Sequence, residues 1–149
     1  MKPMNEALAE ANRSKLLDDV VGLIDEEVGR KGGLSGMALK GGYKVVKGLK
    51  DGRMIHKATD QMLDEFTGAI APLHDEYRQK GAEGSFADFL KRNEGRASDA
   101  LLNVTDRRAA KAEHQIMKKT YEKLRPQAVG HVKEALPGLG RLIDKYTRV

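Results

Sequence analysis

The stretch KGGYKVVKGLK at residues 40–50 decides how the N-terminal third of the chain folds, because its glycines and lysines fit two different structures. One is a glycine-rich loop that binds phosphate, and the other is a helix with one charged face. At about 100° per residue, a helical wheel gathers one group of side chains within a third of the circumference. This group comprises Lys40, Tyr43, Lys44, Lys47 and Lys50.

The opposite side of the same wheel is apolar, with Ala38, Leu39, Gly42, Val45, Val46 and Leu49. A phosphate loop of the G-x-x-x-x-G-K-[ST] type needs a lysine and then a hydroxyl where this chain has Gly42 and Tyr43, and it needs a preceding strand. The stretch therefore predicts an amphipathic helix. Because a glycine costs a helix about 1 kcal/mol relative to alanine, we expect Gly42 to lie at a close contact with a neighbouring helix.

The segment before this helix predicts another amphipathic helix. Apolar residues recur at helical spacing from Leu16 onwards, and Ser14 is the expected N-cap. We expect Gly32 and Gly33 to end this helix and Ser35 to cap the next one, which should stop at the Asp51–Gly52 pair.

These two predicted helices carry opposite charges. Five acids lie between residues 18 and 27, whereas residues 30–57 hold eight Lys or Arg and one acid, a net charge of +7. The whole chain has a net charge of only +5. The acidic and basic helices can therefore pair within the fold, or they can meet across two copies of the chain.

The middle of the chain also has helical spacing. Residues 53–80 predict a long helix, which we expect to kink or break near residues 68–72 because the ring of Pro72 crowds the carbonyl four residues earlier. Residues 80–85 predict a loop. Ser85 is the expected N-cap of a short helix that ends at Gly95.

The last third predicts further helices. One spans Ala97 to Val104, and a long helix capped by Thr105 or Asp106 runs to about Leu124 with Ile116 on its inward side. A last helix should begin at Pro126 and be broken by PGLG at residues 137–140.

Helices joined by short loops, without any alternation typical of strands, predict an all-α bundle of six to seven helices. We expect a single domain over residues 1–149, with residues 1–13 as a loosely ordered N-terminal segment. The chain has no cysteine, which excludes disulfides and thiolate metal sites and fits a reducing compartment. Because neither a signal peptide nor an apolar run of membrane-spanning length is found, we expect a cytoplasmic protein.

A second basic face is predicted on the long helix. Four cations recur along one side of it, namely Arg108, Lys111, Lys118 and Arg125. Lys119 and Lys123 lie beside them.

One cluster near that helix start suggests catalysis: Asp106, Arg107, Arg108 and His114, with His131 close by if the bundle brings it there. The alternative is that Asp106 only caps the helix. The four histidines have no metal-ligand spacing, and we predict no metal, no cofactor and no small-molecule ligand.

Four stretches together resemble a family of small bacterial proteins that carry a domain of unknown function. They are KGGLSGMALKGGYKVVK, DALLNVTDRRAAKA, YEKLRPQAVGHV and ALPGLGRLI, and the resemblance extends from about Leu16 to Ile143. It implies a bacterial all-helical domain. It implies no activity, ligand or catalytic residue.

We predict a non-enzymatic binding or assembly protein that presents its basic helix faces to an acidic protein partner or to a second copy of itself. The alternative is binding of nucleic acid, including ribosomal RNA, through the Lys40–Lys50 face, where Tyr43 would stack on a base. An enzyme of unrecognised type is a third interpretation. A membrane surface is disfavoured, because a chain of this size needs its apolar helix faces for the core.

Overall fold

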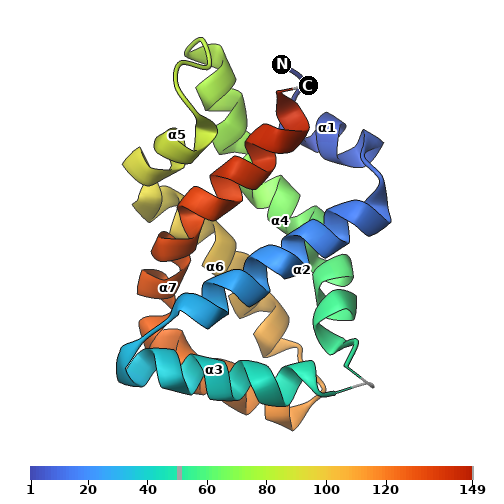
Figure 1. Ribbon diagram of the computed structural model, residues 1–149, viewed down its shortest axis with the longest axis vertical. Helices are drawn as coiled ribbons and strands as arrows, with labels where there is room; N and C mark the ends of the chain where they lie inside the picture. Colours follow the sequence, from blue (N-terminus) through green and yellow to red (C-terminus); the bar gives the residue numbers. More distant parts are fainter. Residues whose placement is uncertain (50–51, 149) are drawn as a thin grey trace.

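The computed structural model describes residues 1–49 and 52–148, apart from the side chains of Leu34 and Ser35. Over those residues the chain forms seven α-helices and no strand, which confirms the predicted all-α bundle (Figure 1). The helices are α1 (Met4–Glu10), α2 (Arg13–Arg30), α3 (Gly33–Lys47), α4 (Met54–Gln79), α5 (Phe86–Arg92), α6 (Glu94–Ala110) and α7 (Gln115–Thr147).

The C-terminal helix α7 is the centre of the architecture. It contacts α1, α2, α3, α5 and α6, and α4 contacts the same set of helices. In Figure 1, α7 starts beside α3 at the lower end of the molecule and runs to the upper end, where both chain termini lie. The two ends of α7 therefore belong to different surroundings.

The core is centred on the upper part, where α4, α5 and α7 meet. Its aromatic side chains are Tyr77, Phe86 and Phe89, all nearly or fully buried, and they pack with Leu136 and Ile143 of α7. Part of the segment 1–13 takes part in this core, because α1 is helical and buries Met4.

Several predicted helix ends are wrong by a few residues. The side chain of Asn12, and not Ser14, caps α2 by accepting a hydrogen bond from the backbone N–H of Lys15 at 3.0 Å. Gly32 is the N-cap of α3, so Ser35 lies inside that helix. Gly95 lies inside α6. The predicted cap at Ser85 is confirmed, since its hydroxyl accepts from the N–H of Asp88 at 3.0 Å.

Proline did not break the helices. α4 continues through Pro72, so of the predicted kink or break the break does not occur, and α7 continues through both Pro126 and Pro137. Pro72 and Pro126 lie on exposed sides of their helices, where water can bond to the carbonyls that each ring leaves without a helical donor. The long helix predicted from Thr105 or Asp106 to about Leu124 is instead interrupted by a loop, because α6 ends at Ala110.

Glycines inside the helices mark close helix–helix contacts. A Cβ added at Gly42 would stand 2.7 Å from the Cγ2 atom of Thr120 on α7, which confirms the contact predicted from the sequence. A Cβ at Gly138 would stand 2.7 Å from Leu23 of α2. One at Gly140 would stand 2.6 Å from the backbone N of Ala87 at the start of α5. PGLG is therefore a packing segment of α7 and not a break.

Candidate functional site

The positive charge of the chain is concentrated at one end of the molecule. We define the basic end as residues 33–57 and 105–125, which comprise α3, the start of α4, the end of α6 and the first turns of α7. These two segments pack against each other at Gly42, and they form the lower end in Figure 1. Their net charges are +5 and +4, so the basic end carries +9 and the remainder of the chain carries −4.

The predicted lysine face of α3 divides into exposed and engaged residues. Lys40 and Lys44 are exposed and make no ion pair within the described part of the chain. Lys47 donates to Asp25 of α2 at 2.9 Å. The half-buried Tyr43 also donates its hydroxyl hydrogen to Asp25. Lys50 lies outside the described residues.

The contact at Asp25 joins the acidic helix α2 to the basic helix α3 within one chain. The hydrogen bond from Tyr43 and the ammonium of Lys47 hold the pKa of the Asp25 carboxyl below its usual range. Burial, together with the Asp25 carboxylate, raises the pKa of Tyr43 well above that of a free tyrosine. Tyr43 is thus a neutral donor that stabilises the α2–α3 contact, with its hydroxyl already bonded.

The second predicted basic face does not lie on a single helix, because its residues are divided between α6 and α7. Arg108 belongs to α6, where its guanidinium pairs with Glu65 and donates to the carbonyl of Gln61 at 3.0 Å. Lys111 is the exposed C-cap of α6. Lys118 and Arg125 follow on α7. The turn after Ala110 places Arg108 and Lys111 at α6, and Lys118 and Arg125 on α7.

The predicted catalytic cluster is not assembled. Asp106 accepts two hydrogen bonds from Arg125, at 2.8 and 3.1 Å, and a third from the hydroxyl of Tyr121. These partners, Arg125 first, hold the pKa of Asp106 below its usual range. Arg107 and His114 line a different groove, and His131 lines a cavity farther along α7.

A polar groove of about 710 Å³ opens at the basic end between α4, α6 and the start of α7. Three exposed cations on its walls make no ion pair within the described residues: Lys57, Arg107 and Lys111. Arg108 and His114 also line it, together with Glu65 and Glu113. The groove is a place where a carboxylate or phosphate would meet several cations at once.

Apolar side chains are exposed among these cations. Met37 is 68% exposed, Val45 51% and Ile116 50%. The predictions that Val45 and Ile116 face inward are wrong. Gly42 of α3 lies against Thr120 and Leu124 of α7, and Leu39 and Val46 line an apolar pocket with these residues, whereas Val45 and Ile116 do not line it. The helical wheel could not show this, because its apolar sector is wider than the actual contact.

Two further properties concern membranes and metals. No helix in the described part of the chain has the length and apolar character needed to cross a membrane. Residues 1–49 and 52–148 contain no group of three or more His, Asp or Glu placed to hold a metal ion.

The fold and this end of it define an all-α protein with a cationic surface. A family model described as a family of unknown function, DUF6918, matches residues 4–147, so the chain belongs to that family. The family resemblance seen in the sequence is confirmed, and it covers nearly the whole chain. No curated protein and no solved structure matches the chain.

Proposed function

We propose that this is a cytoplasmic, non-enzymatic binding protein whose basic end docks an acidic protein partner. The observation that carries the proposal is the difference between the two parts of the chain in the fraction of Lys and Arg residues that form ion pairs. Outside the basic end, nine of fourteen Lys and Arg residues make ion pairs. At the basic end, three of the twelve described cations do so.

Cations without an intramolecular partner are available to an external one. Lys40, Lys44, Lys119 and Lys123 project from α3 and from the first turns of α7, and all four are exposed. Single exposed ion pairs contribute little, about 0 to 1 kcal/mol each. Several like charges on one surface act together by accelerating encounter with an oppositely charged partner and by selecting against cationic ones.

The exposed apolar residues favour a protein partner over nucleic acid. Covering Met37, Val45 and Ile116 with apolar side chains of a partner would remove their surface from water. A phosphate backbone offers no such gain. Binding of nucleic acid, including ribosomal RNA, by the Lys40–Lys44 side of α3 is the alternative.

A second copy of the chain is a weaker candidate for the partner. Its acidic helix α2 would have to supply the carboxylates, but three of the five acids of α2, namely Asp19, Asp25 and Glu27, are engaged within the fold. Asp25 is bonded to Tyr43 and Lys47. Asp19 accepts from Lys145 at 3.0 Å and from Tyr146 at 2.5 Å.

Fluorescence anisotropy with three labelled probes tests the proposal. The probes are an amphipathic peptide with glutamates and leucines at helical spacing, a 30-nucleotide RNA and a DNA duplex, each titrated at two salt concentrations. We expect the peptide to bind and to retain much of its affinity at the higher salt. Stronger RNA or DNA binding with a steep salt dependence would replace the proposal by the nucleic-acid alternative.

Two variants locate the site. Lys40→Glu with Lys44→Glu should weaken the peptide at least about tenfold. Lys91→Glu with Arg92→Glu makes the same charge change on α5, away from the basic end, and should have little effect. Met37→Ser with Val45→Ser should weaken the peptide but not RNA. Equal effects of both charge variants would contradict a specific site at α3.

A further inference from the structure

A cavity of about 340 Å³ lies between the helices of the bundle, and it shares no lining residue with the polar groove of the basic end. Residues of α1, α2, α3, α4, α6 and α7 line it, and most of their side chains are apolar. Its volume is more than twice the roughly 150 Å³ of an engineered apolar cavity that binds benzene or xenon. It also falls within the range of small-molecule sites, about 300 to 1,000 Å³.

An apolar cavity of this size lowers stability unless apolar atoms fill it, because the atoms that line it otherwise lack van der Waals partners. Water is a poor occupant, since aliphatic walls offer it few hydrogen-bond partners. The walls include Leu63, Ile70, Leu102 and Leu136, all of which are buried. A chain-like apolar molecule would restore the missing contacts.

Part of the cavity wall is charged, which is unusual for such an apolar space. Glu27 of α2 and Lys31, the C-cap residue of that helix, both line the cavity, and their side chains are 8% and 4% exposed. The Lys31 ammonium lies 3.6 Å from Glu27 and donates to Glu134 at 2.8 Å and to the carbonyl of His131 at 3.3 Å. Glu27 also pairs with Arg30.

The imidazole of His131 completes this charged part. His131 lines the cavity, and both of its ring nitrogens are buried and have no hydrogen-bond partner within the described part of the chain. A neutral imidazole has one N–H donor and one acceptor, and leaving both without partners in a protein interior is unfavourable. An oxygen of a bound molecule would provide the partner.

We propose that the cavity binds an aliphatic chain that carries a carboxylate, in the manner of a fatty acid, with the carboxylate held at Lys31 and His131. The local charges fit an anion. Glu134, whose side chain is 66% exposed, pairs with Lys31 from the solvent side. When the side chain of Glu134 points into solvent, the net charge of Glu27, Arg30 and Lys31 is +1. One bound carboxylate would neutralise it. The sequence alone predicted no small-molecule ligand; cavity and charges come together only in the fold.

Isothermal titration calorimetry and thermal unfolding with sodium decanoate test this proposal, with decanol as the uncharged counterpart. We expect decanoate to bind at one molecule per chain and to raise the Tm, and decanol to bind at least about tenfold more weakly because it lacks the charge. Binding should persist at 0.5 M NaCl, since a buried contact is screened less than a surface one. Many decanoates per chain, lost at high salt, would overturn the proposal.

Variants distinguish the cavity from the lysine-rich surface. Lys31→Met keeps the length of the side chain and removes its charge, so decanoate affinity should fall to that of decanol. Lys40→Met removes a charge from the exposed face of α3 and should leave affinity unchanged. If decanoate and decanol bind equally to the native protein, the carboxylate site is disproved.

A cavity-filling series keeps the test decisive if Lys31→Met fails to fold. Ala135 lines the cavity, and Ala135→Leu and Ala135→Phe place added carbon atoms where the ligand chain would lie. Both variants should raise the Tm without ligand and reduce or abolish the shift caused by decanoate. A decanoate shift that is unchanged in Ala135→Phe would place the bound molecule elsewhere and overturn the proposal.

Discussion

The two halves of α7 differ in how deeply their residues are buried. Residues buried in α7 are Leu136, Gly138, Gly140, Ile143 and Thr147, all of which lie in its second half. In the first half no residue is buried, and Ile116, Lys119 and Lys123 are exposed. An apolar helical period is therefore not sufficient to bury a helix. The second half of α7 is buried because its glycines allow close packing and a polar network holds it in place.

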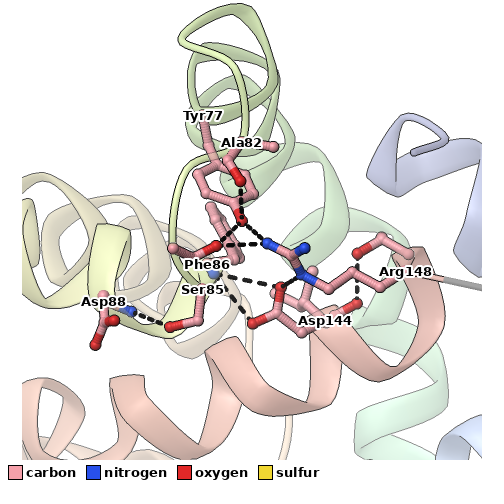
Figure 2. A network of polar contacts seen from close by, with 10 residues as sticks. Tyr77, Ala82, Ser85, Phe86, Asp88, Asp144 and Arg148 are labelled. Atoms are coloured by element: carbon pink, nitrogen blue, oxygen red, sulfur yellow. Dashed lines mark hydrogen bonds and ion pairs between the residues drawn. The ribbon is translucent and has the colours of Figure 1, made fainter.

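That network fastens the loop after α4 to the end of α7 (Figure 2). Tyr77 and Arg148 both donate to the carbonyl of Gly84 at 2.6 Å, and Arg148 also contacts the Tyr77 hydroxyl. The carboxylate of Asp144 accepts from the N–H of Phe86 and from Arg148, each at 3.0 Å. Backbone groups of the loop and of α5 thereby find partners on α7.

Gly140→Ala should break the second half of α7 most severely. The new Cβ would meet the backbone of Ala87, which cannot rotate away as a side chain can. We expect the free energy of unfolding to fall by about 3 kcal/mol, measured by urea denaturation followed by circular dichroism. The matched control is Gly130→Ala in the same helix, where a Cβ meets nothing within 4 Å. That control should gain up to about 1 kcal/mol from helix propensity, and equal losses in both variants would contradict the packing explanation.

Asp144→Ala should have the next largest effect. It leaves the N–H of Phe86 without its acceptor, and Phe86 is fully buried. We expect a loss of about 2 kcal/mol in the free energy of unfolding. Asp99→Ala, at an exposed aspartate of α6, is the control and should change stability by less than about 0.5 kcal/mol. Similar free energies of unfolding for Asp144→Ala and Asp99→Ala would contradict a stabilising role of the network.

His74 should make the upper part of the molecule sensitive to acid. It is fully buried beside Phe86, with ring centroids 4.8 Å apart, and neither ring nitrogen has a partner within the described residues. Burial chiefly lowers the pKa of His74, helped by Arg78 and Arg148 and opposed by Asp75 and Asp144.

Because the folded pKa lies below the unfolded value of about 6.5, the unfolded chain binds more protons below that pH. The free energy of unfolding should therefore fall as the pH decreases from about 6.5, by on the order of 1 kcal/mol by pH 5. His74→Leu should remove this part of the pH dependence. An unchanged pH profile in His74→Leu, measured by urea denaturation at each pH, would show that other groups cause it.

Gly42→Ala should give the smallest effect, because it tests the looser first half of α7. The added Cβ would meet the methyl group of Thr120, a side chain that can shift, and helix propensity offsets part of the cost. We expect a net loss below about 1 kcal/mol. Gly41→Ala, one residue away with nothing within 4 Å, should gain stability instead. A loss as large as that of Gly140→Ala would remove the distinction between the two halves.

Sequence alone determined the helical class, the amphipathic faces, the cap at Ser85 and the close contact at Gly42, and it located the basic segment on α3. These features depend on residues within one or two turns of each other, and such local preferences survive in any bundle. The membership in a family without known activity also followed from pattern alone.

Only the tertiary structure decided where the prolines are tolerated, which lysines make no ion pair with the described residues, and that Tyr43 bonds to Asp25. It also brought Lys31 and His131, one hundred residues apart, to the same cavity. The physical reason is common to all of these. The energy of a helical proline, of a charge or of a buried imidazole depends on which groups from distant segments surround it, and no spacing along the chain contains that information.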